Sequence, residues 1–278
     1  MGALPLVSVV VPTHNSAASL PACLDSIVRQ SYPSIEIVVV DNYSTDASRE
    51  VGLAVTPHVF THGPERSAQR NAGARAARGS YLVFIDSDMV LGSTIVERCI
   101  RISTEDAAVK GIIIPERSVG EGFWACCKAL ERSCYVGDDT IEAARFFDRS
   151  AFEIVGGYDE ALTAAEDWDL SQRVALLGPL RRIDTYIMHL EGRLRLRDTM
   201  SSKFYYGQTL GQYIRKHPGS AARQLQLVRP AFVRHRRRLL AHPLLTAGLV
   251  VMKFCEFAAG GAGLTFAAWQ WAGKGRRA

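Results

Sequence analysis

Several patterns that would assign a chain to a common class are missing from these 278 residues. The six cysteines are irregularly spaced and none forms a C-x-x-C pair, which argues against a disulfide framework and favours a reducing, cytosolic setting. The N-terminus has no basic segment, and its short apolar run lies between Pro5 and Pro12, so the run predicts a first strand and not a signal peptide. No internal repeat or low-complexity linker precedes residue 198. Because 47% of the residues are apolar, the chain has enough for a core and is too apolar for disorder.

Charge is distributed unevenly along the chain, although the net charge is only +5. Residues 181–238 contain 14 Lys and Arg against three Asp and Glu, whereas residues 1–180 have a net charge of −9. An acidic first part followed by a basic region indicates that only the second part meets an anionic partner. We expect no nucleic acid among the partners.

The first half of the chain alternates short apolar runs with helical patterns. This alternation predicts an α/β fold with a mostly parallel sheet covered by helices on both faces. The predicted strands are residues 6–11, 35–40, 58–60, 81–85, 108–114, 141–148 and 181–189. The main predicted helices are residues 16–30, 67–77, 94–102, 123–134, 166–177 and 201–217.

Two aspartates, Asp86 and Asp88, end the most apolar of these strands, with one serine between them. Side chains at positions i and i+2 of a strand point to the same side, so the two carboxylates converge if the chain stays extended. Carboxylates that close repel each other unless a cation lies between them, and Mg²⁺ or Mn²⁺ keeps waters or a ligand's phosphates as further ligands. The motif therefore predicts a metal site that holds a diphosphate; the alternative is a loop with two solvated acids.

Together, several stretches resemble the glycosyltransferase family 2 enzymes of the GT-A fold. The matching pieces occur in the family's order, at residues 7–15, 37–46, 70–73, 86–88, 156–160 and 166–167. The resemblance covers roughly residues 6–192 and implies a Rossmann-like, mostly parallel mixed sheet with helices on both faces. We therefore predict a GT-A catalytic domain at residues 1–197 and a basic, apolar helical region at residues 198–278.

The resemblance also implies a binding site for a nucleoside-diphosphate sugar. Asp41 would contact the nucleobase, although it would otherwise serve as a cap for the following helix. Arg70 would meet the ribose or the diphosphate, or else be a surface arginine. The remaining donor-binding residues implied by the resemblance are Pro12, Thr13, Asn15, Asp86, Gly156 and Gly157.

The same resemblance assigns metal ligands and a catalytic base. Asp86, Asp88 and His189 would form the metal site, with Asp88 directly on the ion and Asp86 toward the ribose or sugar; a lone histidine is otherwise a partly buried polar residue. The ion is Mn²⁺ or Mg²⁺, and an imidazole ligand favours Mn²⁺. Transfer with inversion needs one carboxylate to take the acceptor's proton. Asp167 matches this base and Glu166 orients the substrates, although acids also suit a first helical turn.

The C-terminal part combines basic clusters with apolar segments. Arg193, Arg195 and Arg197 alternate, so an extended chain would present all three on one face, to a phosphate or to solvent. Arg234 to Arg238 precede a largely apolar stretch that Lys253 and Glu256, a potential helical pair, divide into charge-free pieces at residues 239–252 and 257–273. Each piece is short for a membrane span, which needs roughly 20 residues.

Basic residues at both ends of the stretch, including Lys274, Arg276 and Arg277, predict that both ends stay cytoplasmic. We therefore expect a re-entrant or in-plane hairpin, or two short crossings, with Trp269 and Trp271 at the interface. The alternative is a helical pair packed on the catalytic domain or on a second subunit.

These expectations predict an inverting glycosyltransferase on the cytoplasmic face of the membrane. Its partners would be the nucleoside-diphosphate sugar, a lipid-linked polyprenyl glycan acceptor and the anionic membrane surface. One alternative is a nucleotidyltransferase, which residues 12–16 disfavour because they lack the glycine and lysine of a phosphate loop. Another is a catalytically inactive nucleotide-sugar-binding scaffold of the same fold. The oligomeric state and the identity of the sugar stay open.

Overall fold

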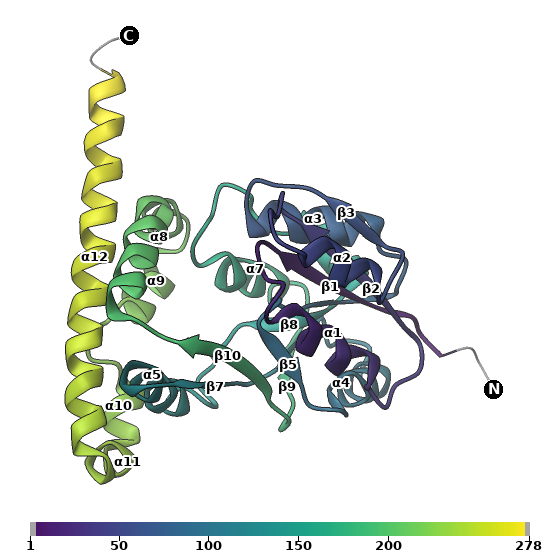
Figure 1. Cartoon of the computed structure of the whole chain (residues 1–278), viewed down its shortest axis with the longest axis horizontal. Coiled ribbons are helices and arrows are strands. Elements are labelled where there is room, and N and C mark those ends of the chain that lie inside the picture. Colours follow the sequence, from purple (N-terminus) through teal and green to yellow (C-terminus); the bar gives the residue numbers. More distant parts are fainter. Residues whose placement is uncertain (1–3, 276–278) are drawn as a thin grey trace. The chain divides into compact units, whose positions relative to one another are not determined.

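The computed structural model describes residues 4–275 and forms two compact units (Figure 1). Unit 1 comprises Met1–Arg117, Glu142–Glu160 and Glu166–Leu190. Unit 2 comprises Ser118–Ile141, Ala161–Ala165 and Glu191–Ala278. Two internal segments of the predicted catalytic domain thus group with the C-terminal helices.

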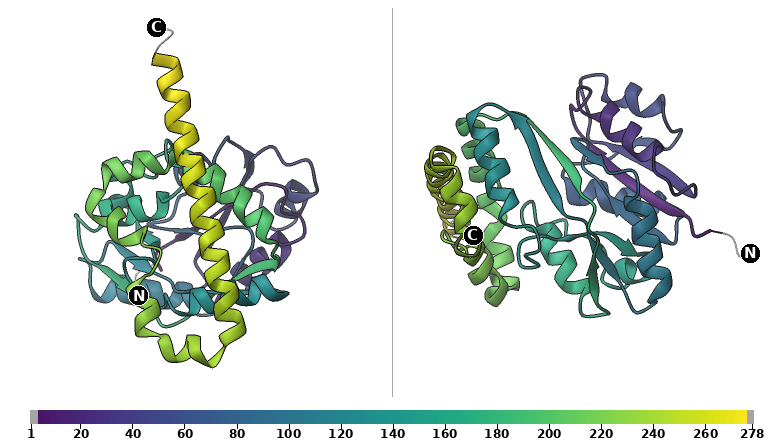
Figure 2. Two further views of the ribbon diagram at one scale, coloured as in Figure 1. Left: turned by 90° about the vertical axis from the view of Figure 1, so that its left-hand side faces the viewer. Right: turned by 90° about the horizontal axis from the view of Figure 1, so that it is seen from below.

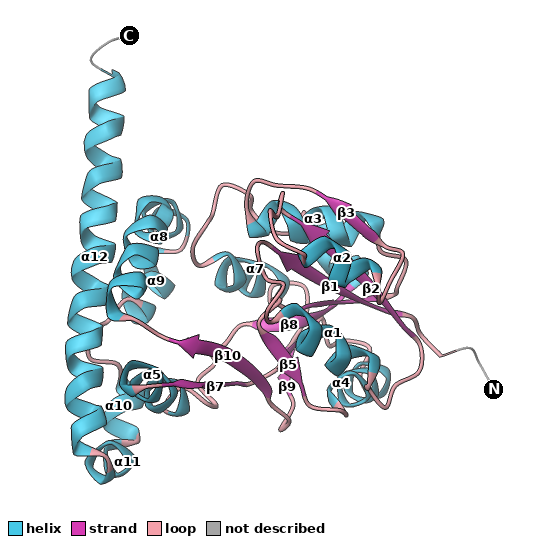
Figure 3. Cartoon of the chain, viewed as in Figure 1, coloured by secondary structure: helices cyan, strands magenta, loops and turns pink. Residues whose placement is uncertain are grey.

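A mixed sheet of seven strands forms the centre of unit 1 (Figure 3). Its order is β3-β2-β1-β4-β8-β6-β9, with β4 and β6 both antiparallel to β8 and the other neighbouring pairs parallel. The central strands are mostly apolar because both faces of the sheet are covered. The bounds are β1 Val7–Thr13, β2 Ile35–Asp41, β3 Val59–Thr61, β4 Tyr81–Phe84, β6 Gly111–Ile113, β8 Ala144–Asp148 and β9 Leu180–Arg182.

Helices cover both faces of this sheet, as the sequence predicted. One apolar core holds side chains of α1 and α4, including Leu24 and Ile95, and the other holds side chains of α3, α6 and α7, including Ala74, Ala151 and Leu170. The helices of unit 1 are α1 Leu20–Val28, α2 Ser48–Leu53, α3 Arg66–Ala76, α4 Ile95–Glu105, α6 Arg149–Ile154 and α7 Glu166–Val174.

A smaller sheet has the order β5-β10-β7, formed by Met89–Leu91, Ile187–Arg193 and Glu116–Glu121. The prediction of one strand over residues 181–189 is wrong, because the segment divides between the two sheets. Strand β9 pairs with β6 in the large sheet, whereas β10 runs antiparallel to β5. Both β7 and β10 begin in unit 1 and continue into unit 2.

Unit 2 consists mainly of helices. They are α5 Phe123–Ser133, α8 Leu196–Lys216, α9 Pro218–Gln224, α10 Pro230–Arg234, α11 Arg236–Ala241 and α12 Pro243–Gly275. Because α8 begins at Leu196, Arg197 is helical and the extended face expected for Arg193, Arg195 and Arg197 does not form.

The predicted hairpin or pair of crossings at the C-terminus is also wrong, since α12 is one continuous helix. Lys253 and Glu256 form the expected pair, with Nζ 2.5 Å from Oε2, so their charges are neutralised without a break in the helix. Of the residues assigned to the membrane interface, Arg276 and Arg277 lie outside the described residues, as do the side chains of Trp271 and Lys274.

A buried carboxylate joins β1, β2 and the segment before β4. Glu36 Oε1 accepts from the Ser8 hydroxyl at 2.5 Å and from the backbone N–H of Gly79 at 3.1 Å, and Arg78 bonds the same carboxylate through its backbone N–H and, at 3.0 Å, through Nε. Burial alone would raise the pKa of Glu36, but the bonds from Ser8 and Arg78 lower it below its usual value. The carboxylate therefore stays ionised and links β1, β2 and the segment before β4.

We predict that Glu36→Gln destabilises the protein by about 1–3 kcal/mol at neutral pH, because it removes charge-assisted bonds in a buried place. The folded-state pKa is lowered, so the contribution of Glu36 is present above about pH 4.3 and is lost as the pH falls below that value. Urea unfolding of wild type and variant measures the difference in their free energies of unfolding. This difference should be smaller at pH 4 than at pH 7. The exposed Glu105→Gln is the control; an equal effect of both substitutions would contradict this role.

Candidate active site

The site lies at the carboxyl ends of β1, β2 and β4, where ligands of open α/β sheets bind. Thr13 and Asp41 are the last residues of β1 and β2 and face each other in register. Asp41 Oδ2 accepts from the Ser44 N–H at 3.0 Å, whereas Asp41 Oδ1 and Thr13 Oγ1 are buried with no hydrogen-bond partner among the described residues. These two atoms are available to a polar ligand.

The chain turns directly after β4 and does not stay extended. Met89 N–H donates to Asp86 O at 3.0 Å, and the Ser87 hydroxyl lies 2.8 Å from the Ser16 hydroxyl. The Cys23 thiol donates to the Asp86 carbonyl, with Sγ 3.6 Å from the oxygen, and burial raises the pKa of this thiol. The turn gives the carboxylates of Asp86 and Asp88 different partners, so the expectation of an extended Asp86–Asp88 segment is wrong.

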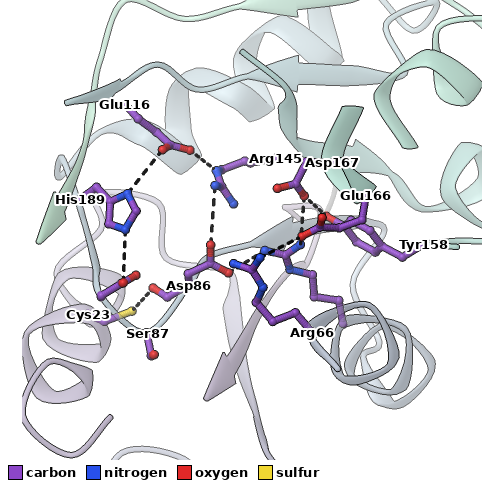
Figure 4. Close-up of polar contacts among 12 residues, drawn as sticks. Cys23, Arg66, Asp86, Ser87, Glu116, Arg145, Tyr158, Glu166, Asp167 and His189 are labelled. Atoms are coloured by element: carbon purple, nitrogen blue, oxygen red, sulfur yellow. Dashed lines mark hydrogen bonds and ion pairs between the residues drawn. The ribbon is translucent and has the colours of Figure 1, made fainter. Parts of the chain in front are cut away.

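Arg70 of α3 is the centre of the site, and Figure 4 labels the three acids that it bonds, Asp86, Glu166 and Asp167. Its side chain is fully buried, with Nη2 2.6 Å from Asp86 Oδ1 and Nη1 3.0 Å from Asp167 Oδ1. Nη1 also lies 3.4 Å from Glu166 Oε1. Burial would raise the pKa of Asp86, but Arg70 and then Arg145 lower it far below its usual range. The alternative of a surface arginine is excluded by this burial.

Glu166 and Asp167 open α7 and differ in exposure. The Glu166 side chain is 6% exposed and the Asp167 side chain 24%, so Asp167 is the more accessible acid. Burial, followed by the charge of Asp167, raises the pKa of Glu166. Tyr158 donates its hydroxyl to Asp167 Oδ1 at 3.2 Å, and burial followed by the same charge raises its pKa, so the phenol remains a donor.

A second arginine, missed by the sequence analysis, extends the charged cluster. Arg145 of β8 lies with Nε 2.6 Å from Glu116 Oε1 and Nη2 3.7 Å from Asp86 Oδ2. The other oxygen of Glu116 is 3.8 Å from His189 Nδ1, and His189 Nε2 is 3.2 Å from Asp88 Oδ2. Neither Arg145 nor Glu116 stands in a motif, since they come from β8 and β7 and meet only in the folded chain.

The predicted metal ligands are only partly brought together. The structure places His189 beside Asp88, whose Oδ1 is buried without a hydrogen-bond partner among the described residues. Asp86 is held instead by two arginines, and no group of three His, Cys, Asp or Glu within the described part of the chain is arranged to hold a metal. Asp86, Asp88 and His189 therefore do not form a three-ligand set.

The remaining predicted residues support the loops around the site. Asn15 has φ 48° and joins the loops after β1 and β2, because its Oδ1 accepts from the Thr45 N–H at 2.8 Å. Gly156 and Gly157 have φ 80° and 70°, a region that favours glycine. Asn71 bonds Tyr158 N–H and O, both at 2.9 Å, and so fixes the glycine turn to α3. Pro12 is buried within β1.

Comparison with known proteins gives a family match for the first part of the chain. Residues 8–134 match the model of glycosyl transferase family 2. An uncharacterized glycosyltransferase of Bacillus subtilis (strain 168), EpsJ, is 32% identical over 139 residues, which are 48% of this chain and 38% of EpsJ. The chain thus spans less than half the length of that relative.

Solved structures show the same fold. The mannosyltransferase PcManGT from Pyrobaculum calidifontis, in complex with GDP-Man and Mn²⁺, is 21% identical with a TM-score of 0.58, covering 95% of this chain and 75% of that one. TarS 1–349 of S. aureus in complex with UDP is 16% identical with a TM-score of 0.56, covering 96% and 92%. The expected GT-A-like fold, a mixed α/β sheet with helices, is confirmed.

We predict that Arg145→Met lowers the free energy of unfolding by about 3–5 kcal/mol, because it leaves the largely buried carboxylates of Glu116 and Asp86 without this counterion. The double variant Arg145→Met/Glu116→Gln should recover part of the loss. Arg29→Met, which removes an ion pair of exposed side chains, should cost less than about 1 kcal/mol. Chemical unfolding measures all three, and a loss at Arg145 no larger than that at Arg29 would contradict the arrangement.

Proposed function

We propose that the chain is an inverting, metal-dependent glycosyltransferase that moves a sugar from a nucleoside diphosphate to an acceptor hydroxyl. The observation that carries the proposal is the position of Arg70, which bonds Asp86 after β4 and Asp167 at the start of α7 with one guanidinium group. A donor-side acid and an acid suited to be the base therefore lie within the reach of a single side chain.

The donor would bind with its nucleobase at the ends of β1 and β2. Asp41 Oδ1 and Thr13 Oγ1, both buried without a hydrogen-bond partner among the described residues, would pair with polar atoms of the base. Leaving such atoms unpaired is costly, so a bound nucleotide would stabilise the protein. Uridine is the donor base we favour, since a UDP complex of TarS is known among the structural neighbours.

Asp88 and His189 are the residues that would hold a divalent cation. His189 fits because its second ring nitrogen faces Glu116, an arrangement typical of metal-binding histidines. The site also has uncompensated negative charge: the carboxylates of Asp86, Asp88, Glu116, Glu166 and Asp167 face the guanidinium groups of Arg66, Arg70 and Arg145. When bound, Mn²⁺ or Mg²⁺ neutralises charge on the leaving diphosphate.

Asp167 would act as the base. Among the described residues, Arg70 and Tyr158 both donate to its Oδ1, which leaves Oδ2 to accept the proton of the acceptor hydroxyl. Attack by that hydroxyl on the face opposite the diphosphate inverts the anomeric centre. Glu166, with its raised pKa, would orient the substrates, and Asp86 would point to the ribose or sugar from its place between Arg70 and Arg145.

We further propose a lipid-linked glycan as acceptor, at the cytoplasmic face of a membrane. Two observations support this: Pro243–Gln270 is long and apolar enough to cross a bilayer by length and composition, and residues 217–242 contain six arginines and no acid. All six cysteines are free thiols, which agrees with a reducing compartment.

We predict that purified protein is stabilised by a nucleoside-diphosphate sugar only when Mn²⁺ or Mg²⁺ is present, and that it releases the nucleoside diphosphate. Asp167→Asn should keep the donor-induced rise in Tm but reduce turnover by about 10²–10⁴, since it removes the proton acceptor. Asp88→Asn should abolish this metal-dependent rise in Tm. Thermal shift across donors, release assays and NMR of the product anomer provide the measurements.

The controls separate this function from its alternative. Asp148→Asn, at the cap of α6 away from the site, should retain both donor stabilisation and turnover. Donor binding without turnover, unchanged in Asp167→Asn, would instead favour an inactive nucleotide-sugar-binding scaffold. Retention of the donor's anomeric configuration in the product would exclude the inverting mechanism.

A further inference from the structure

Helix α12 has its charged residues on the side that faces the protein. Within Pro243–Gln270 the charged residues are Lys253 and Glu256, and they are only 8% and 4% exposed. Lys253 Nζ lies 2.8 Å from Glu131 Oε1 of α5, and Glu256 Oε1 lies 3.3 Å from Lys128 Nζ, also of α5. These four groups form a buried ion cluster that holds α12 against α5.

The opposite side of the same helix is apolar and exposed. We call it the apolar face of α12; Figure 2 (left) shows the backbone of α12 in front of the other helices of unit 2. The large side chains of this face are Leu244, Val250, Val251, Phe254, Phe266 and Trp269, which are 39–72% exposed. A surface helix in water has the reverse arrangement, with apolar side chains toward the protein and charges outside. This face therefore needs an apolar environment.

Glycines allow α12 to lie directly against α8. A Cβ at Gly207 of α8 would collide with the carbonyl of Gly260, and one at Gly263 would collide with the carbonyl of Phe204. Close backbone contact through small residues is typical of helices that pair in lipid. With the ion cluster, this contact fixes α12 to α5 near its middle and to α8 further along.

Exposed arginines come shortly before α12 in the sequence. Arg234, Arg236 and Arg237 are exposed on α10 and α11, and Leu240, which is 76% exposed, follows them. Exposed arginines next to exposed apolar side chains match the boundary between lipid headgroups and acyl chains. The complementary partner of such a surface is an anionic bilayer.

We propose that unit 2 binds an anionic membrane with α12 lying in the plane of the bilayer, its apolar face in the acyl layer and Arg234, Arg236 and Arg237 at the lipid phosphates. This inference deepens the membrane partner of the proposed function and names the surface involved. It does not depend on the sugar chemistry, because the residues that carry it belong to unit 2 alone.

An in-plane position follows from what α12 is attached to. A crossing by α12 would take α5 and α8 into the hydrocarbon as well, since the ion cluster and the glycine contacts bind them to it. These helices carry charges outside the cluster, such as Arg132, Asp198 and Arg215, and charge in the hydrocarbon is costly. A second copy of the chain is the other candidate occupant, but protein interfaces have a polar rim and the apolar face lacks charge along its length.

The first experiment is co-sedimentation of the full chain with vesicles of phosphatidylcholine, with and without phosphatidylglycerol. Val250→Glu/Phe254→Glu should weaken binding to both kinds of vesicle at least tenfold. Ile154→Glu/Leu176→Glu adds the same charge at exposed apolar positions of unit 1 and should leave binding unchanged. Arg234→Gln/Arg236→Gln/Arg237→Gln should weaken binding only to the anionic vesicles and reduce its dependence on salt.

The second experiment tests the orientation in a bacterial host. In a background lacking the exposed Cys126 and the half-buried Cys255, Ala241→Cys marks the position just before α12 and Gln270→Cys marks a position near its other end. An in-plane helix predicts that a membrane-impermeant thiol reagent labels neither position in intact spheroplasts and both after lysis. Labelling of one end in intact spheroplasts would show a crossing and overturn the proposal.

Further outcomes would also overturn it. If wild type did not bind vesicles and Val250→Glu/Phe254→Glu converted a dimer to a monomer in light scattering, the face would be a contact between copies. The thermal shift with donor separates this inference from the transferase proposal. If Val250→Glu/Phe254→Glu loses vesicle binding but is still stabilised by the donor, the result supports membrane binding through the apolar face. This conclusion holds whether or not the protein transfers a sugar.

Discussion

The arrangement of the candidate site depends on one buried cation, the guanidinium group of Arg70. A fully buried charge is costly unless opposite charges and hydrogen bonds surround it. Arg70 meets this condition by bonding Asp86, Glu166 and Asp167, which come from segments 16 to 97 residues away in the sequence. Because the acids and the arginine stabilise one another in the interior, the segment after β4 and the start of α7 are held next to each other.

The charge pairs beyond Arg70 extend this constraint. Arg145 bonds Glu116 and faces Asp86, and His189 lies between Glu116 and Asp88, so three strands are joined to the same cluster. The cluster is preorganised, yet Asp88 Oδ1, Asp41 Oδ1 and Thr13 Oγ1 are left unpaired among the described residues. The proposed cation and nucleotide would pair with these three oxygen atoms, so binding would stabilise the site although it is preorganised.

The buried charges of unit 2 are also paired, and here the pairing determines which side of α12 is apolar. These charges, Lys128, Glu131, Lys253 and Glu256, neutralise one another between α5 and α12. Since α12 has no other charge over Pro243–Gln270, pairing these groups inward leaves an apolar exterior. An identical composition with Lys253 and Glu256 turned outward would describe an ordinary amphipathic helix.

Local patterns were sufficient for the strand that ends in Asp41, for the strand that precedes Asp86, for α3 and for the acids that open α7, because apolar periodicity and caps act over a few residues. They did not reveal Arg145 and Glu116, the turn at Asp86, the split of residues 181–189 or the continuity of α12. Each of these depends on a partner distant in the chain: Arg70 for Asp86, β5 for β10, and Lys128 with Glu131 for the charges of α12. The sequence alone determined most of the candidate residues for the chemistry, but not Arg145 and Glu116. The tertiary structure decided which of the candidates meet, because charge pairing in the interior depends on distance in space.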